Sequence, residues 1–173
     1  MTKDAKTSLN RRADIISAAI EVFAETGYYK ATTAQVAQRV QISQPYVFRF
    51  FATKEQLLLS ALEVSWMRII KSFRQVIESA SSERLEAELI EIYEEISESH
   101  RNEMLLQMQA QVIQENPIQE AMRFGFRGVH RMVLEAFRQA GDSNPKESTM
   151  LFLARGMLCN LAEAIRLPEL KER

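Results

Sequence analysis

One stretch of 35 residues constrains the fold more than any other part of the chain. Residues 27–61 read GYYKATTAQVAQRVQISQPYVFRFFATKEQLLLSA. The spacing predicts a short helix that opens at Thr32 or Thr33, a tight turn over residues 40–43, a compact aromatic helix over 44–51 and a long helix from Lys54. This order of elements is that of a helix-turn-helix unit, whose second helix enters the DNA major groove.

The ends of these helices carry residues that favour starting and stopping there. Gly27 supplies the left-handed conformation that ends the entering helix, which is predicted over residues 9–26. Ser43 is suited to cap the third helix, and Pro45 fits its first turn, where no backbone N–H is needed.

The rest of the chain repeats the helical spacing. Apolar residues recur every three or four positions after residue 53, and no alternating strand pattern occurs. The sequence therefore predicts an all-α fold. The expected inward residues of the fourth to seventh helices are Leu62, Trp66, Ile69, Ile70, Phe73, Val76 and Ile77; Leu85, Leu89, Ile92, Tyr93 and Ile96; Met104, Leu105, Met108 and Val112; and Met122, Val129, Met132, Val133 and Phe137.

The final helix is apolar on nearly every side. From residue 150 to residue 165, twelve of the sixteen residues are apolar. Such a helix must be covered all round, and a body of this size covers one flank. We therefore expect the last two helices to form a homodimer interface; the alternative is a central helix buried within one subunit. The expected interface residues are Met150, Leu151, Leu153, Ala154, Met157, Leu158 and Leu161.

Composition argues against several other classes of protein. No run of about 18 apolar residues is present and the N-terminus lacks an apolar signal core, so we expect a cytoplasmic protein without a membrane span. The single cysteine, Cys159, permits no internal disulfide, and with His100 and His130 on other helices it makes a poor metal set. No glycine-rich phosphate loop, nucleophile elbow or H-E-x-x-H motif is present, so neither an enzyme nor a cofactor is expected.

Charge is distributed unevenly along the chain. Residues 1–60 carry eight basic and five acidic residues, whereas the remainder carries 14 basic and 18 acidic residues. A basic front on an acidic body suits contact with phosphates at one end only.

At these residues the chain resembles the TetR family of transcriptional repressors. The resemblance covers residues 12–62 and includes the segments IISAAIEVFAETGY, TT-x-x-VA and IS-x-x-x-x-F-x-F-F-x-x-KE-x-L. It implies an N-terminal three-helix helix-turn-helix DNA-binding domain (1–53) joined to a C-terminal helical ligand-sensing and dimerisation domain (54–173). Two departures stand out: Gln41 occupies the turn position where the family usually has glycine, and Phe48 lacks the hydroxyl of the family's tyrosine.

Seven residues are expected to contact DNA. Glutamine can bind adenine through two hydrogen bonds, arginine can bind guanine or phosphate, and hydroxyl groups and lysine can bind phosphates. The alternative is that these residues are only solvated surface groups and helix caps. The expected DNA-binding residues are Thr33, Ser43, Gln44, Pro45, Tyr46, Arg49 and Lys54.

The family resemblance also implies a sensor for a small molecule. We expect an unknown small hydrophobic effector to enter the body and release the protein, as a repressor, from a palindromic double-stranded operator. A helical dimeric interaction protein without DNA binding is the alternative. Apolar residues at helical spacing are usually core, and with that alternative open the candidates to line a pocket are Trp66, Phe73, Tyr93, Met104, Met108 and Phe124.

Overall fold

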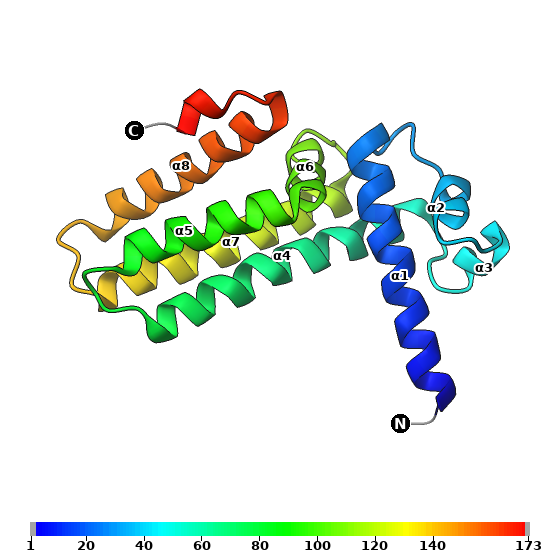
Figure 1. The fold of residues 1–173 in the computed structure, drawn as a ribbon, viewed down its shortest axis with the longest axis horizontal. Coiled ribbons are helices and arrows are strands. Elements are labelled where there is room, and N and C mark those ends of the chain that lie inside the picture. Colours follow the sequence, from blue (N-terminus) through cyan, green and yellow to red (C-terminus); the bar gives the residue numbers. More distant parts are fainter. Residues whose placement is uncertain (1–2, 172–173) are drawn as a thin grey trace.

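The computed structural model describes residues 3–171, with side chains from Ser8 onward, and all the regular secondary structure within that range is helical. None of the described helices is long and apolar enough to span a membrane. The elements are α1 (Lys3–Thr26), α2 (Thr33–Arg39), α3 (Gln44–Phe48), α4 (Lys54–Ser79), α5 (Leu85–Ser99), α6 (Arg101–Ala110), α7 (Asn116–Gln139), α8 (Pro145–Ile165) and a short 3-10 turn η1 (Pro168–Lys171) (Figure 1).

Helices α1 to α3 form a compact unit at one end of the molecule (Figure 1); because it is the part expected to bind DNA, we call it the DNA-binding unit. Thr32 begins α2 with a reciprocal cap, in which its hydroxyl accepts from the Gln35 N–H and the Gln35 side chain accepts from the Thr32 N–H. The α2–α3 turn closes through two backbone bonds, from Gln41 to Gln38 and from Ile42 to Ala37. This turn places Gln41 in the left-handed region, with φ of 55°, where the family usually has glycine.

The body consists of α4 to α8. Helices α5 and α7 each pack along α4, α8 lies across α5 and α7, and α6 lies between these helices and α1 (Figure 1). One continuous hydrophobic core runs through both parts, from Ile15 in α1 to Phe152 in α8. The DNA-binding unit and the body are therefore packed as one piece.

The predicted stripes agree with the burial pattern except in α6, and α3 is shorter than predicted. Helix α3 ends at Phe48 rather than at residue 51. Beyond its end, the N–H groups of Phe50 and Phe51 both donate to the Val47 carbonyl. The stripe predicted for α6 was partly wrong: Val112 lies beyond the end of the helix and is 74% exposed. The buried face of α6 instead includes Gln107, a polar residue that an apolar pattern does not reveal.

Gly125 in α7 lets Trp66 of α4 pack across the helix backbone. A Cβ added at Gly125 would lie within 3.0 Å of three atoms of the Trp66 indole, closer than real Cβ atoms approach their neighbours. The other flank of the indole meets Phe126, whose ring centroid lies 4.9 Å away in an edge-on arrangement. Trp66 is thus fixed in a slot that only glycine leaves open.

We predict that Gly125→Ala lowers the free energy of unfolding by about 1–3 kcal/mol, because the new methyl group must displace a buried, rigid ring. Gly128→Ala on the same helix is the matched control. Its Cβ would meet the Ile70 Cδ1 at an ordinary 3.6 Å, and alanine favours a helix over glycine by about 0.5–1 kcal/mol. Urea unfolding measures both variants, and equal stabilities would contradict the close packing at Gly125.

Candidate DNA-binding surface and ligand cavity

Helix α3 lies at the outer end of the DNA-binding unit, away from the body (Figure 1). Val47 is fully buried and Phe51, just beyond the helix, is nearly so; both anchor α3 to the core. Gln44, Pro45, Phe48 and Arg49 are exposed, and Tyr46 is partly exposed. The predicted contact residues of α3 therefore share the outward side of the helix.

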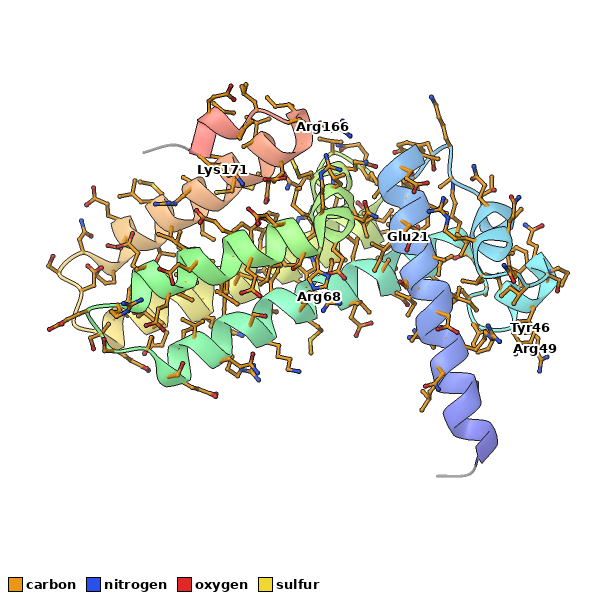
Figure 2. All side chains as sticks on the ribbon, in the orientation of Figure 1. Glu21, Tyr46, Arg49, Arg68, Arg166 and Lys171 are labelled. Atoms are coloured by element: carbon orange, nitrogen blue, oxygen red, sulfur yellow. The ribbon has the colours of Figure 1, made fainter. Side chains whose placement is uncertain are left out.

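Tyr46 and Arg49 form one outward-facing pair (Figure 2). The Arg49 guanidinium carbon lies 5.2 Å from the Tyr46 ring centroid, and the ring is braced from the other direction by Phe50 at 5.4 Å. A cation held over an aromatic face keeps its hydrogen-bond donors free at its edge. The pair can therefore present a positioned guanidinium and a phenol to the same short stretch of a groove.

Thr33 and Ser43 differ in how available their hydroxyls are. Thr33 is only 7% exposed, and its hydroxyl accepts a hydrogen bond of 2.8 Å from the Gln44 side-chain nitrogen. In this geometry the Thr33 hydroxyl holds the Gln44 side chain in place. Ser43 is exposed and makes no capping bond with its side chain, so its hydroxyl is free to meet a phosphate.

Lys54, which was also expected to contact DNA, makes hydrogen bonds within the chain. Its ammonium donates to three backbone carbonyls of the loop after α1, those of Tyr28 (2.7 Å), Ala31 (3.1 Å) and Tyr29 (3.3 Å). It also lies 4.6 Å from the centroid of the Tyr28 ring. The charge is therefore already engaged, and it fastens the first turn of α4 to the end of α1.

A second basic residue of the DNA-binding unit is also paired within the chain. Arg39 in α2 makes two bonds to the Glu25 carboxylate, at 2.8 and 2.7 Å, and one of 2.9 Å to Glu21, both on α1. The hydrogen bonds from Arg39 hold the pKa of Glu25 below its ordinary value. This exposed cluster joins α1 to α2, and the charge of Arg39 is already paired with two carboxylates.

We predict that Tyr46→Ala leaves the fold intact and weakens specific DNA binding by roughly 1–3 kcal/mol per lost base contact. Tyr29→Ala is the control, because Tyr29 is also an exposed tyrosine but its hydroxyl bonds to Glu115 on the body side. Fluorescence anisotropy with a selected duplex measures both. Unchanged affinity in a folded Tyr46→Ala protein would remove Tyr46 from the DNA-binding surface.

We predict that Lys54→Met lowers the free energy of unfolding by about 1–2 kcal/mol, because three carbonyls lose a charged donor. The slope of log affinity for DNA against log salt should stay unchanged, since no phosphate contact is lost. Lys30→Met, at an exposed lysine of the same loop, is the control for stability. A shallower salt slope in a folded Lys54→Met protein would restore the phosphate role.

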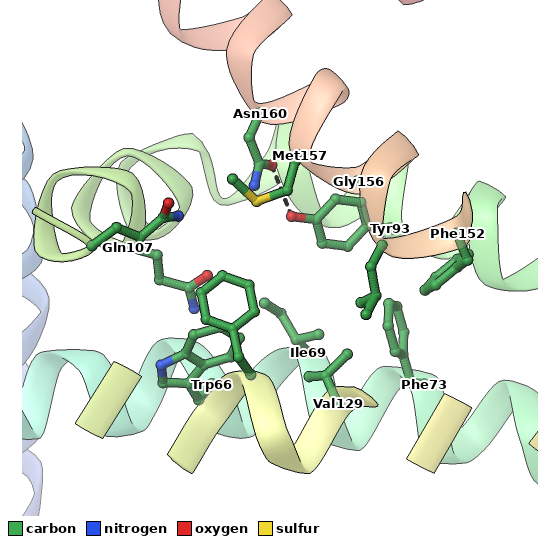
Figure 3. Close-up of a pocket in the computed structure, with 13 residues that line it drawn as sticks. Trp66, Ile69, Phe73, Tyr93, Gln107, Val129, Phe152, Gly156, Met157 and Asn160 are labelled. Atoms are coloured by element: carbon green, nitrogen blue, oxygen red, sulfur yellow. Dashed lines mark hydrogen bonds between the residues drawn. The ribbon is translucent and has the colours of Figure 1, made fainter. Parts of the chain in front are cut away.

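The body contains an apolar cavity between α4, α5, α6, α7 and α8 (Figure 3). The cavity has a volume of about 40 Å³ and is partly open to solvent. Its lining, mostly apolar with a few polar groups, is of the kind found in small-molecule sites. It is lined by Trp66, Ile69, Phe73, Tyr93, Gln107, Gln111, Phe126, Val129, Phe152, Leu153, Gly156, Met157 and Asn160.

The six residues expected to line a pocket fall into three groups. Trp66, Phe73 and Tyr93 line this cavity, and Met104 lines a smaller neighbouring one that also touches Tyr93 and His100. Met108 lies half-buried on α6, outside the lining of both. The expectation for Phe124 was wrong: its side chain is 75% exposed and does not line the cavity. Its neighbour on α7, Phe126, lines the cavity instead.

The polar residues of the cavity were missed in the sequence. The Tyr93 hydroxyl donates to the Asn160 side-chain oxygen at 2.8 Å, and burial raises the pKa of Tyr93 to about 12, so the phenol stays neutral. The Gln107 side-chain nitrogen donates to the Ser65 hydroxyl at 3.0 Å. The sequence signal that could have predicted these contacts is the presence of a glutamine and an asparagine among the apolar residues of two helices.

Helix α8 has an exposed apolar side, which we call the outer face of α8. Its residues Met150, Leu151, Leu158, Leu161 and Ile165 are 42 to 60% exposed, and Ala154 is also exposed between them. The other two residues expected at an interface are Leu153, which is partly buried, and Met157, which is 37% exposed. Leu153 packs against the core, and Met157 lies at the edge of the cavity that it helps to line.

Comparison with known proteins agrees with this geometry. Residues 15–61 match the model of the bacterial regulatory proteins of the tetR family. The transcriptional activator FasR of Mycolicibacterium smegmatis is 30% identical over 74 residues, which are 43% of this chain and 34% of FasR. The fatty acid metabolism regulator of Bacillus subtilis is 24% identical over 149 residues, which are 83% of this chain and 75% of that protein.

The likeness in fold extends through the body. The crystal structure of the transcriptional regulator FadR from Bacillus subtilis in complex with stearoyl-CoA superposes with a TM-score of 0.77 at 16% identity, over 89% of this chain and 88% of that one. The match to FasR, by contrast, spans about a third of that protein, so it concerns the DNA-binding unit. The match at the helix-turn-helix argues against a helical dimer that binds no DNA.

Proposed function

We propose that this chain, whose residues 15–61 match the tetR family of bacterial regulatory proteins, is a repressor that leaves a palindromic operator when a small hydrophobic effector enters its body. The observation that carries this proposal is the pairing of an outward-facing α3 with an apolar cavity in one continuously packed molecule. In the expected division of the chain, α3 lies in the DNA-binding domain (1–53) and the cavity lies in the ligand-binding and dimerisation domain (54–173).

We propose that the protein acts on DNA as a homodimer through α7 and α8. The outer face of α8 is an unpartnered apolar surface, which supports an association between copies. A two-fold dimer would present its two α3 helices to major grooves about 34–36 Å apart, or a multiple of that distance. The operator would then be palindromic, because the symmetry of the protein is matched by the DNA.

The chemistry of the cavity supports an apolar effector. Eight of its lining residues have apolar side chains: Ile69, Phe73, Phe126, Val129, Phe152, Leu153, Met157 and Trp66. Its four polar lining residues are uncharged: Tyr93, Gln107, Gln111 and Asn160. The likeness to a regulator crystallised with stearoyl-CoA supports the same class of ligand, one with a long hydrocarbon portion. The ligand would be held mainly by burial of apolar surface.

Two helices connect the cavity to the DNA-binding unit. Helix α4 lines the cavity with Trp66, and its first turn is fastened to the loop after α1 through Lys54. Helix α6 lines it with Gln107, while Gln109, two residues further on, donates to the Ala24 carbonyl of α1 at 2.8 Å. A ligand that shifts α4 or α6 would tilt the two α3 helices and change their spacing, which requires only that it favour one arrangement over the other.

Selection of bound duplexes from a random pool tests the proposed function. The purified protein should enrich a palindromic sequence, and its affinity for that duplex should fall steeply with salt, since phosphate neutralisation releases counterions. Lipophilic compounds are then screened for release of the duplex. No binding even at low salt would contradict the DNA role, and an enriched site that no lipophilic compound releases would contradict the switch alone.

We predict that Leu161→Arg converts the dimer to a folded monomer and lowers operator affinity at least tenfold, because a charge in the centre of an apolar interface loses its hydration. Leu161 does not line the cavity, so ligand binding should persist. Met67→Arg is the control: Met67 is also an exposed apolar residue, but it lies on α4. Analytical ultracentrifugation measures both, and a dimeric Leu161→Arg protein would place the interface elsewhere.

A further inference from the structure

The outward side of α3 has an apolar centre. Successive residues of an α-helix are turned by about 100°, so Pro45 and Phe48 lie at the middle of the exposed arc. Gln44 flanks them on one side and Arg49 on the other, while the buried Val47 faces the core. The polar residues expected to read bases therefore border an apolar strip, formed by Pro45 and Phe48, and do not occupy the centre themselves.

Phe48 is exposed although the other aromatic rings of this segment are packed. Phe51 is 2% exposed, and Tyr46 and Phe50 pack edge-on with their ring centroids 5.4 Å apart. Phe48, in contrast, is 45% exposed. Apolar surface in contact with water is unfavourable, and another apolar group that covers it is bound favourably. The ring of Phe48 therefore has surface available for an apolar partner.

The polar residues at the borders of the strip are held by contacts within the chain. The Gln44 side-chain nitrogen donates to the Thr33 hydroxyl at 2.8 Å, which leaves the amide oxygen and the second N–H of Gln44 for other partners. The Arg49 guanidinium carbon lies 5.2 Å from the Tyr46 ring centroid (Figure 2). Both borders can thus bind polar atoms of a duplex, and a duplex bound by both would lie against the strip between them.

The major groove of unmodified DNA offers one apolar group, the 5-methyl group of thymine. The other base edges present hydrogen-bond donors or acceptors there. A phenyl ring that covered a donor or acceptor would take it out of water without giving it a partner, which is unfavourable. The methyl group of thymine is therefore the feature of the groove that matches an exposed phenylalanine.

We propose that Phe48 is a specificity-determining residue that contacts the methyl group of one thymine in each half-site of the operator. This inference rests on the proposed function and names the base that the centre of α3 selects. Gln44 and Phe48 are one helical turn apart, roughly 5–6 Å between their Cβ atoms, and successive base pairs are about 3.4 Å apart. The thymine therefore lies within two base pairs of the base that Gln44 contacts.

Replacement of thymine by uracil tests this assignment, because it removes the methyl group and leaves the hydrogen-bonding edge unchanged. The duplex selected from the random pool is synthesised with uracil at one symmetric pair of thymine positions at a time. Burial of one methyl group corresponds to about fourfold in affinity. At one pair of positions, uracil should therefore weaken binding about tenfold to twentyfold, as measured by fluorescence anisotropy. At the same positions, 5-methylcytosine should bind more tightly than cytosine by a similar factor.

Variants of Phe48 show whether this residue is the one that contacts the methyl group. In Phe48→Ala the ratio of the thymine to the uracil affinity should fall to about one, whereas Phe48→Leu keeps an apolar side chain and should keep most of the ratio. A merely structural Phe48 would weaken both duplexes equally and leave the ratio unchanged. Tyr29→Ala is the matched control, because it removes another exposed aromatic ring of the DNA-binding unit and should preserve the ratio.

Each outcome decides the proposal. A methyl preference that disappears in Phe48→Ala and persists in Phe48→Leu and Tyr29→Ala supports it. Equal binding of the thymine and uracil duplexes at every position, or a methyl preference that survives Phe48→Ala, overturns it and leaves the regulator function in place. Failure of the wild-type protein to bind any duplex would overturn the regulator function as well, so the two failures are distinguishable.

Discussion

Burial of one apolar face along α4 is the constraint on which the rest of the molecule depends. Leu57, Leu58 and Ala61 are completely buried in its first half, close to the DNA-binding unit, and Ile69 and Phe73 line the cavity in its second half. Turning or sliding this helix would expose large side chains at both ends at once, at about 1.5–3 kcal/mol each. The DNA-binding surface and the cavity therefore cannot change independently of each other.

The helix-turn-helix was predictable because its determinants are local. Gly27, the cap at Thr32 and the buried Val47 each act on neighbouring residues, so their spacing identifies the unit without knowledge of the rest of the fold. Gln41 illustrates the same point, since its position in the turn requires a left-handed backbone whatever residue occupies it. Sequence therefore predicted the all-helical fold and the outward side of α3.

The contacts of long side chains were not predictable, because they join residues distant in sequence. Lys54 reaches back to carbonyls of residues 28 to 31, and the Gln44 amide reaches Thr33. The cavity depends on five helices, and its form follows from which side of α7 faces α4. A helical pattern gives the apolar side of α7, but not that Gly125 opens a slot while Phe124 faces outward.

The contacts that Arg39 and Lys54 make within the chain bear on how the protein finds its site in a genome. Arg39 and Lys54 are occupied within the chain, so the attraction of each subunit to arbitrary duplex rests on fewer positive charges than the sequence contains. Every phosphate contact that is absent weakens non-specific retention without lowering discrimination between bases. The protein should consequently spend less time on irrelevant DNA, and its residence at the operator should depend on the few side chains that α3 presents.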